Sequence, residues 1–446
     1  MKHTDDRYAP ILAANRIYGD TYVSFLEKYS PNEEERLYVS VFAPTAIEYV
    51  RWVLADSMKK GIKRLYFLAR DAYSMYVVAD MMCRHFNIDI DCRYLCISRY
   101  SVRIPEYHLI GEQCIDRICI GGIDVTFRKM LMRAGLCADD IDMATKVCGY
   151  EGKCDEILNY SQINALKDVL KSDKGLLKKI YDISKQEYDN AVAYFKQEGL
   201  LDDVEYALVD SGWIGTLQQS LRNILKSAGR KRNLLGYYFG MYELPKGENI
   251  NSYRSFYFSP NKGLRRKVLF SNCLFEFVFS APFGMTLRYE KSEVGYLPIY
   301  SSDENANASS VRNHIESLKN YTVLWLTKVQ NIYEDTDYEM LERLLGMCMA
   351  LPSVIEAQIL GSGKFSDDVL EHSMKTVAAR LTQEDIKNQR LLNRLMIVSG
   401  MKKKVIRESA WIEGSIVLNG TNVKKNLRHV RIYKYFVYLR KQLKRG

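Results

Sequence analysis

The sequence lacks the features that mark membrane-spanning, secreted and zinc-binding proteins. Its 446 residues include no apolar run of about 18 residues, the length that a membrane-spanning helix needs. The first seven residues are mostly polar, so we expect no signal peptide. The ten cysteines form no CxxC pair, and no two of the six histidines are four residues apart. We therefore expect free thiols in a reducing cytoplasm, without a zinc site or a histidine-based metal site.

The composition is that of a globular protein with a large core. Hydrophobic residues make up 47% of the chain and charged residues 26%. A chain of this length can form two domains, or one domain with a large insertion.

Positive charge gathers at the C-terminal end of the chain. From residue 424 onward the sequence holds many Lys and Arg but no Asp or Glu, and Ile432, Phe436, Leu439 and Leu443 recur at helical spacing. Basic amphipathic helices of this kind lie on anionic membrane surfaces. A terminal helix that packs on the protein through its apolar stripe has the same pattern, and the sequence leaves both open. We expect no nucleic-acid partner, because no nucleic-acid-binding module accompanies the charge.

The order of the predicted elements indicates an α/β fold with a parallel sheet. Residues 1–60 have a helical pattern, with Pro44 in the first turn of a helix that Gly61 ends. A strand at 64–69, a helix at 73–83 and a strand at 92–97 follow with short loops, as in a parallel sheet. Further strands are predicted at 205–209, 234–239 and 253–258.

These patterns divide the chain into four parts. We expect an N-terminal helical segment at 1–60, an α/β core at 61–104 and 200–300, and a helical insertion at 105–199. A polar loop at 305–309 precedes a helical C-terminal region at 310–446, which ends in the basic tail.

The segment YALVDSGWIGTLQ, residues 206–218, is the most informative. It predicts a buried strand that ends at Asp210, a short Gly/Thr loop and a helix. Free backbone N–H groups at such a helix start bind phosphate, and an acid beside them can bind sugar hydroxyls or a metal. A phosphorylated sugar or a nucleotide is the first ligand to consider, although an ordinary strand–turn–helix has the same pattern.

Three predicted strands end in polar side chains. These are Arg70 and Asp71, then Ser98, Arg99 and Arg103, and finally Asp210 and Ser211. Ligands of parallel sheets bind at the carboxyl ends of the strands. Arginines grip phosphates in a bidentate way, and carboxylates together with phosphates bind Mg²⁺. The sequence therefore predicts a site for a substrate with several phosphates.

Four segments, in this order, resemble a set found in bacterial surface-polysaccharide gene clusters. They are YFLARDAY (66–73), ISRYSVR (97–103), VDSGWIGT (209–216) and FEFVFSAPFG (275–284). On these motifs, roughly residues 15–300 resemble glycan phosphoribosyltransferases (ribofuranosyltransferases), which are similar to type I phosphoribosyltransferases and often fused to a phosphatase of the haloacid dehalogenase class. The resemblance implies a Rossmann-like sheet of phosphoribosyltransferase type. It also implies transfer of 5-phosphoribosyl from 5-phosphoribosyl diphosphate (PRPP) to a glycan hydroxyl, after which a separate phosphatase acts on the product.

The resemblance implies a PRPP loop at residues 210–216. The residues of the donor site in this loop would be Asp210, Ser211, Gly212, Trp213, Gly215 and Thr216. The two glycines and Thr216 would cradle the 5-phosphate, and Asp210 would bind the ribose hydroxyls or a metal. The chain departs from ordinary phosphoribosyltransferases in its shorter loop and in Ser211, where a second acid is common.

The resemblance also implies a diphosphate site at the first two strands. Arg70 and Asp71 would lie beside the diphosphate, and Arg99 and Arg103 would neutralise it as it leaves. Mg²⁺ is the implied cofactor, with Asp210 and Asp71 as its ligands. Ala72 stands where we would expect Gly in relatives.

The expected reaction needs a carboxylate as base. Departure of the diphosphate builds positive charge on the ribose ring, and a single displacement gives a β-ribofuranosyl 5-phosphate. The acceptor hydroxyl loses its proton to a nearby carboxylate, for which Asp71 is the first candidate and Glu276 the second. Apolar neighbours would raise the pKa of Glu276, although it is also explained as a charge at the edge of an element. Trp213 either stacks on a sugar or packs in the core.

Two other functions stay open. A haloacid dehalogenase-type sugar phosphatase has a similar strand, but it needs an acid two residues after the first Asp, where this chain has Gly212. A non-catalytic scaffold for polysaccharide assembly would explain the basic tail but not three polar strand ends. We expect a cytoplasmic enzyme whose tail holds it at the inner face of the membrane, near a lipid-linked oligosaccharide acceptor. The insertion and the C-terminal region would form the acceptor cleft.

Overall fold

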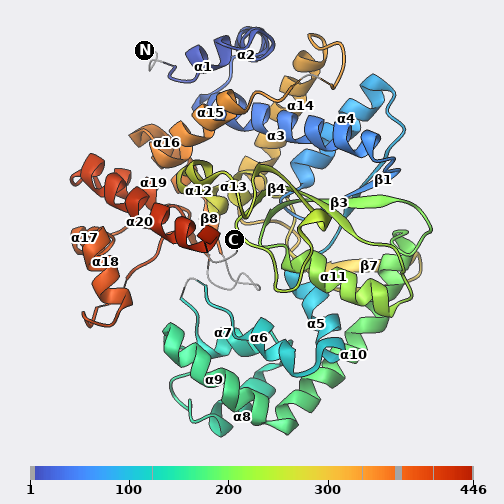
Figure 1. The fold of residues 1–446 in the computed structure, drawn as a ribbon, viewed down its shortest axis with the longest axis vertical. Helices are drawn as coiled ribbons and strands as arrows, with labels where there is room; N and C mark the ends of the chain where they lie inside the picture. The colour runs from blue at the N-terminus through green and yellow to red at the C-terminus, as the bar shows by residue number, and fades with distance from the viewer. Residues whose placement is uncertain (1–5, 123, 334, 367–373, 405, 444–446) are drawn as a thin grey trace.

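The centre of the protein is a five-stranded, all-parallel sheet (Figure 1). The structure is a computed structural model that describes residues 6–122, 124–333, 335–366, 374–404 and 406–443. Its sheet has the order β2-β1-β3-β4-β5. The strands are β1 (Arg64–Leu68), β2 (Asp91–Leu95), β3 (Tyr206–Trp213), β4 (Leu235–Met241) and β5 (Tyr253–Phe258). The predicted α/β fold with a parallel sheet is confirmed.

Helices bury both faces of the sheet. On one face lie α3 (Glu33–Lys59), α4 (Tyr73–Phe86), α14 (Ala308–Leu326) and α15 (Tyr338–Ala350); on the other lie α5 (Arg99–Ile110), α10 (Lys174–Gln197) and α11 (Thr216–Ser227). The side chains of β1 alternate between the two faces of the sheet. Leu65 and Phe67 belong to the apolar core on the first face, and Tyr66 and Leu68 belong to the core on the second face. The continuous apolar strands recognised in the sequence therefore reflect burial on both sides.

Helix α3 corrects the prediction for Pro44. The helix begins at Glu33, after a reciprocal capping box between Asn32 and Glu35, and Pro44 lies inside it rather than in its first turn. Nearly every residue from Leu37 to Leu54 is buried. This burial outweighs the cost of an interior proline, which local sequence signals alone cannot show.

The predicted helices between the second and third strands are present and have a core of their own. They begin with α5 and end with α10, and between these lie η1 (Gly111–Gln113), α6 (Cys114–Ile118), α7 (Phe127–Met132), α8 (Ala138–Val147) and α9 (Tyr160–Ser172). An apolar cluster separate from the sheet joins them, and they form the lower part of the molecule in Figure 1.

An antiparallel hairpin, which the sequence analysis missed, covers the seam between α5 and α10. Its strands are β6 (Thr286–Ser292) and β7 (Gly295–Tyr300). Tyr289 is buried and stacks on Tyr194 of α10, with ring centroids 4.2 Å apart. The hairpin thus holds the start of α5, where Ser98 donates to the Thr286 carbonyl at 2.6 Å.

The remaining helices lie near the N-terminus, between β4 and β5, and after β5. They are α1 (Ala9–Ala13), α2 (Arg16–Tyr29), η2 (Ile250–Ser252), α12 (Leu264–Leu269), α13 (Asn272–Val278), α16 (Val354–Gly361), α17 (Gln383–Asn388), α18 (Leu391–Val398), α19 (Ile412–Asn419) and α20 (Val423–Leu443), with a short pair β8 (Lys364–Phe365) and β9 (Lys375–Thr376). In the described ranges no helix alone has the length and apolarity to cross a membrane; α15 and α16 reach them only as a pair bent by 81°. The predicted loop at 305–309 is shorter than expected, because α14 begins at Ala308. The loop is anchored at its start, since buried Asn305 donates to Ser280 and to the Ala281 carbonyl.

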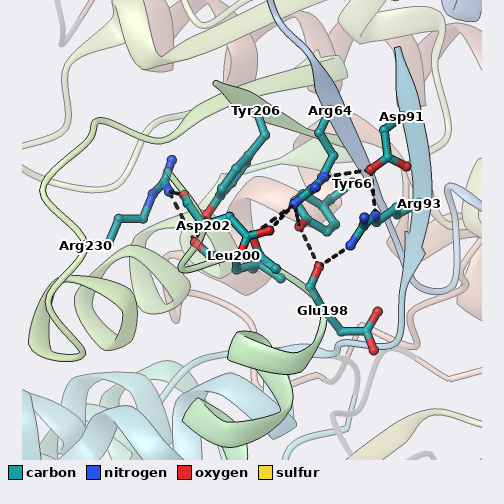
Figure 2. Close-up of polar contacts among 10 residues, drawn as sticks. Arg64, Tyr66, Asp91, Arg93, Glu198, Leu200, Asp202, Tyr206 and Arg230 are labelled. Atoms are coloured by element: carbon teal, nitrogen blue, oxygen red, sulfur yellow. Dashed lines mark hydrogen bonds and ion pairs between the residues drawn. The ribbon is translucent and has the colours of Figure 1, made fainter. Parts of the chain in front are cut away.

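A polar network closes the amino ends of β1 and β2 (Figure 2). Arg64 donates to Asp202 at 2.9 Å, while the Tyr66 hydroxyl and Arg93 donate to the Glu198 carbonyl at 2.7 and 2.9 Å. These contacts fasten the end of α10 to the amino edge of the sheet. They leave the carboxyl edge as the place for a ligand.

Candidate active site

The strand order reverses at the carboxyl ends of β1 and β3, the place at which open parallel sheets hold ligands in a crevice. The chain passes from β1 to β2 on one side and later enters β3 on the other side of β1, so the order reverses there. Ligands of open parallel sheets bind at such a switch point. Asp71 follows β1 and Asp210 lies in β3, so two of the predicted site residues lie at this point.

Strand β3 is longer than the sequence predicted. It does not end at Asp210, because Gly212 and Trp213 continue to pair with Gly240 and Met241 of β4. Gly212 has φ 108°, and a Cβ there would lie 2.6 Å from the Gly240 carbonyl oxygen. Only glycine lets the two backbones approach so closely. The loop before α11 is therefore reduced to residues 214 and 215.

The start of α11 faces a buried arginine of α5. Gly215 caps the helix in the left-handed conformation, so no side chain satisfies the first backbone N–H groups. Arg103 is 5% exposed and donates through one Nη to the Thr216 hydroxyl at 3.2 Å. Its Nε and other Nη have no hydrogen-bond partner among the described residues. Free N–H groups and a positive charge thus converge on one point.

No carboxylate of the described residues forms an ion pair with Arg103. Its pKa is lowered to about 10, mainly by burial and also by the charges of Arg99, Arg117 and Arg133, while Tyr107 opposes this. The carboxylate of Glu106, one turn later in α5, accepts from Ser220 and Asn223 of α11 instead. A buried charge without a counterion is costly, so this arrangement favours a bound anion.

The sequence analysis placed Arg103 with the leaving diphosphate. The structure places its guanidinium at Thr216, which the same analysis assigned to the 5-phosphate. The reason is helical geometry: Arg99 and Arg103 are one turn apart in α5, so only the exposed Arg99 remains at the rim of the crevice.

Asp71 and Asp210 form an acidic pair at the floor of the crevice. The pKa of Asp210 is raised to about 7, mainly by burial and also by the neighbouring Asp71, while the backbone N–H groups of Ser211 and Gly212 oppose this. Asp71 accepts a hydrogen bond from the Ser211 hydroxyl at 2.7 Å. Like charges this close are a common feature of reactive sites.

Tyr49 of α3 positions this part of β3, and no signal in the sequence pointed to this role. Its buried hydroxyl donates to the backbone carbonyls of Asp210 and Tyr237, both at 2.9 Å. A tyrosine inside a long buried helix looks like any core residue, since its role depends on which strands pack against it.

Glu276 brings a third carboxylate to the site from α13. Its pKa is raised to about 8, mainly by burial and also by the charge of Asp71. The charge of Arg99 and a hydrogen bond from Trp213 act in the opposite direction. The Trp213 indole N–H donates to Glu276 Oε1 at 2.5 Å. The structure therefore brings both predicted base candidates, Asp71 and Glu276, within electrostatic reach of Asp210.

Trp213 lies among aromatic side chains. Its ring centroid is 5.3 Å from that of Phe270, 5.7 Å from Phe275 and 6.0 Å from Tyr242. This arrangement matches the core-packing interpretation, with the indole N–H used to orient Glu276.

An aromatic group beside Asp71 was missed. Tyr73, Tyr94 and Phe283 contact one another edge to face, with centroids 5.1 to 5.8 Å apart. Half-buried Arg70 acts on the same group, since its charge opposes the burial that raises the pKa of Tyr94. Phe283 belongs to the fourth motif, so this motif was the sequence signal that could have pointed to the aromatic group.

The acidic pair fits a magnesium ion that arrives with phosphates. Among the described residues no three His, Cys, Asp or Glu are placed to hold a metal together. Mg²⁺ is usually held by one or two carboxylates plus substrate phosphates and water. Asp71 and Asp210 supply such oxygen ligands, and a cation beside them would remove the repulsion that raises the pKa of Asp210.

We expect Asp210→Asn to stabilise the folded protein at alkaline pH. A carboxyl whose pKa is about 7 when folded and about 3.9 when unfolded holds its proton more tightly in the folded state, so stability falls as pH rises from 4 to 7. Removing the charge should raise the free energy of unfolding by roughly 2–4 kcal/mol at pH 8 and have little effect at pH 4. Denaturant unfolding at both pH values measures this. The exposed control Asp303→Asn should show no such difference, and an equal effect of Asp210→Asn at both pH values would contradict the buried charge.

A comparison with protein-family models finds no match to this chain, and a search of curated proteins finds none either. A function must therefore be argued from the arrangement of Asp71, Asp210, Glu276 and Arg103.

Proposed function

We propose that this protein transfers 5-phosphoribosyl from PRPP to a hydroxyl of a glycan and releases diphosphate. The observation that carries the proposal is the buried Arg103, whose unpaired N–H groups meet the open start of α11 in the same crevice as the pair Asp71 and Asp210. PRPP has a phosphate at one end, a diphosphate at the other and two hydroxyls between. An anion site, an acidic pair and a crevice between them suit such a molecule.

The fold is compatible with the proposal. The parallel order 2-1-3-4-5, with the ligand crevice at β1 and β3, is compatible with a Rossmann-like sheet. We extend this to a sheet of phosphoribosyltransferase type, in which residues 214–216 hold the 5-phosphate together with Arg103.

The side chains then have separate tasks. Arg103 and the backbone N–H groups at Thr216 bind the 5-phosphate, and Asp210 orients the ribose hydroxyls. Arg70 and Arg99 lie on the side of the crevice where the diphosphate would leave, and their charges stabilise it as it departs. Mg²⁺ bound with the substrate at Asp71 and Asp210 supplies further neutralisation of the diphosphate.

Glu276 suits the role of general base better than Asp71. A base is most effective when its pKa is near the working pH, and burial places that of Glu276 at about 8. In the displacement, the bond from C1 to the diphosphate oxygen breaks and the acceptor oxygen bonds to C1. The acceptor proton passes to Glu276, and the diphosphate leaves with the electron pair. The product is a β-ribofuranosyl 5-phosphate, which a separate phosphatase would convert to ribofuranose.

The acceptor would be a lipid-linked oligosaccharide. Tyr73 and Phe283 offer ring surfaces at the edge of the crevice, next to Asp71, where a sugar can pack. The two other functions have less support: Gly212 leaves the second acid of a haloacid dehalogenase-type phosphatase without a counterpart, and a scaffold has no need of an uncompensated buried charge.

Product analysis tests the reaction. The protein is incubated with PRPP, MgCl₂ and a detergent-solubilised glycolipid extract of a polysaccharide-producing bacterium, and phosphorus NMR follows the products. We expect free diphosphate and a new phosphomonoester on the glycolipid, both absent with Asp210→Asn. Release of orthophosphate from PRPP or from ribose 5-phosphate, without diphosphate, would instead identify a phosphatase.

A further inference from the structure

Helix α20 packs on the protein through its N-terminal half. The residues that it buries are Asn426, Leu427 and Val430. Farther along, Lys434 donates to buried Glu413 and Lys441 donates to Glu243, both at 2.6 Å. Two basic side chains of the tail thus pair with acids of other elements.

The apolar stripe of α20 faces outward. Phe436 is 55% exposed and Leu443 73% exposed, while Ile432 and Leu439 are half-buried. The sequence left open whether this stripe packs on the protein or lies on a membrane. Phe436 and Leu443 do not pack on the described residues, because they lie on the side of the helix opposite its buried residues, whereas Ile432 and Leu439 are partly covered.

Helix α18, which contacts α20, also exposes apolar side chains. None of its residues is buried, and Leu392 is 72% exposed and Met401, just after the helix, 73%. It lies beside α20 at one side of the molecule (Figure 1), where Arg390 donates to Asn426 at 2.9 Å and Arg394 lies 4.4 Å from the centroid of the Tyr433 ring. We call the outward faces of α18 and α20 the α18–α20 surface.

Basic residues surround the apolar side chains of this surface. The exposed ones include Lys402 and Lys403 after α18 and Lys424, Lys425 and Arg428 on α20. Neither residues 386–407 nor residues 423–443 contain an Asp or Glu. The flanking acids are Glu384, Asp385 and Glu408; Glu384 pairs with Lys404 and Glu408 with Arg394, and neither pairs with the exposed bases just named.

We propose that the α18–α20 surface binds an anionic lipid bilayer, with its apolar side chains in the interface and its bases at the headgroups. Both features are needed for this assignment. Bases alone would suit a nucleic acid, but exposed Leu392, Met401 and Leu443 have no role on a phosphate backbone. Apolar side chains interleaved with bases fit a bilayer surface, where anionic headgroups cover an apolar interior.

The surface is connected to the crevice through stacked rings. Tyr438 of α20 stacks on Tyr242 with centroids 5.0 Å apart, and Tyr242 lies 6.0 Å from Trp213. If the proposed function holds, membrane binding brings the crevice to the lipid that carries the acceptor; binding itself does not depend on that function.

Vesicle flotation of the full chain tests the proposal. Vesicles of phosphatidylcholine alone are compared with vesicles of equal parts phosphatidylcholine and phosphatidylglycerol, at low and at high salt. We expect binding to the mixed vesicles only, weakened by salt. Replacing Lys424, Lys425 and Arg428 with Gln should reduce the partition coefficient roughly 100-fold. The matched control replaces three exposed lysines elsewhere, Lys153, Lys178 and Lys231, and should bind as the wild type does.

A second pair of variants tests insertion. Phe436→Ser combined with Leu443→Ser should reduce binding about 10-fold or more, whereas Val294→Ser, 84% exposed in the hairpin, should not. The proposal is overturned if the wild type does not float with the mixed vesicles, if the serine pair binds as the wild type does, or if the surface instead retains RNA and no vesicles.

Discussion

Arg103→Met is expected to weaken PRPP binding about 100-fold, since it removes hydrogen bonds from a charged donor to a phosphate, worth roughly 1.5–3 kcal/mol each. Methionine keeps most of the volume of the side chain. It also removes a buried charge that has no counterion in the free protein, so the folded state should be as stable as the wild type or more so. Calorimetric titration and denaturant unfolding of the same preparations separate the two effects.

The ligand dependence shows which phosphate Arg103 recognises. If it binds the 5-phosphate, the variant loses affinity for ribose 5-phosphate as much as for PRPP, and affinity for free diphosphate changes little. Arg230→Met is the matched control, because Arg230 follows the far end of α11 and stacks on Tyr206 with its Cζ 3.9 Å from the ring centroid. A selective loss of diphosphate affinity would return Arg103 to the role that the sequence suggested. Unchanged binding of all three ligands would remove the anion site.

Glu276→Gln should reduce kcat by about 10²–10⁴ while PRPP affinity stays within a few-fold, since a general base acts on the acceptor rather than on the donor. The base must be ionised, so kcat of the wild type should rise with pH and level off above about 8. Steady-state rates from pH 6 to 9 measure this, and Gln should remove the dependence.

Trp213→Phe is a sharper test of the same carboxylate. The indole N–H stabilises the ionised form of Glu276, and losing it should move the pH profile upward by about one unit without lowering the plateau. Full activity of Glu276→Gln, with activity lost in Asp71→Asn, would show that Asp71 is the base.

The sequence predicted the sheet and the positions of its strands because buried parallel strands are continuous apolar runs between turn signals. It also predicted that Asp71 and Asp210 meet, since carboxyl ends of parallel strands share one edge. Pro44 was misplaced because tertiary burial decided the length of α3. The hairpin at 286–300 was missed because its pairing is visible only once α5 and α10 are in place.

Side-chain direction was the part that local patterns could not supply. Arg103 as a phosphate ligand stays a prediction, and its contact with Thr216, 113 residues away across the whole insertion, could not be foreseen. The exposed stripe of α20 shows the same limit, because helical spacing identifies a stripe but not the side on which the protein packs. The raised pKa of Glu276 was expected from its apolar neighbours, whereas its hydrogen bond to Trp213 was not.

Calorimetric titration of PRPP with MgCl₂ into the wild type and Asp210→Asn tests most directly whether the crevice between β1 and β3 is a PRPP site. We predict saturable binding of one PRPP to the wild type, competition by ribose 5-phosphate, and loss of binding in the variant. Unfolding at pH 8 must show the variant at least as stable as the wild type, so that the loss reports the site and not the fold. An absence of binding to folded wild type would contradict the account.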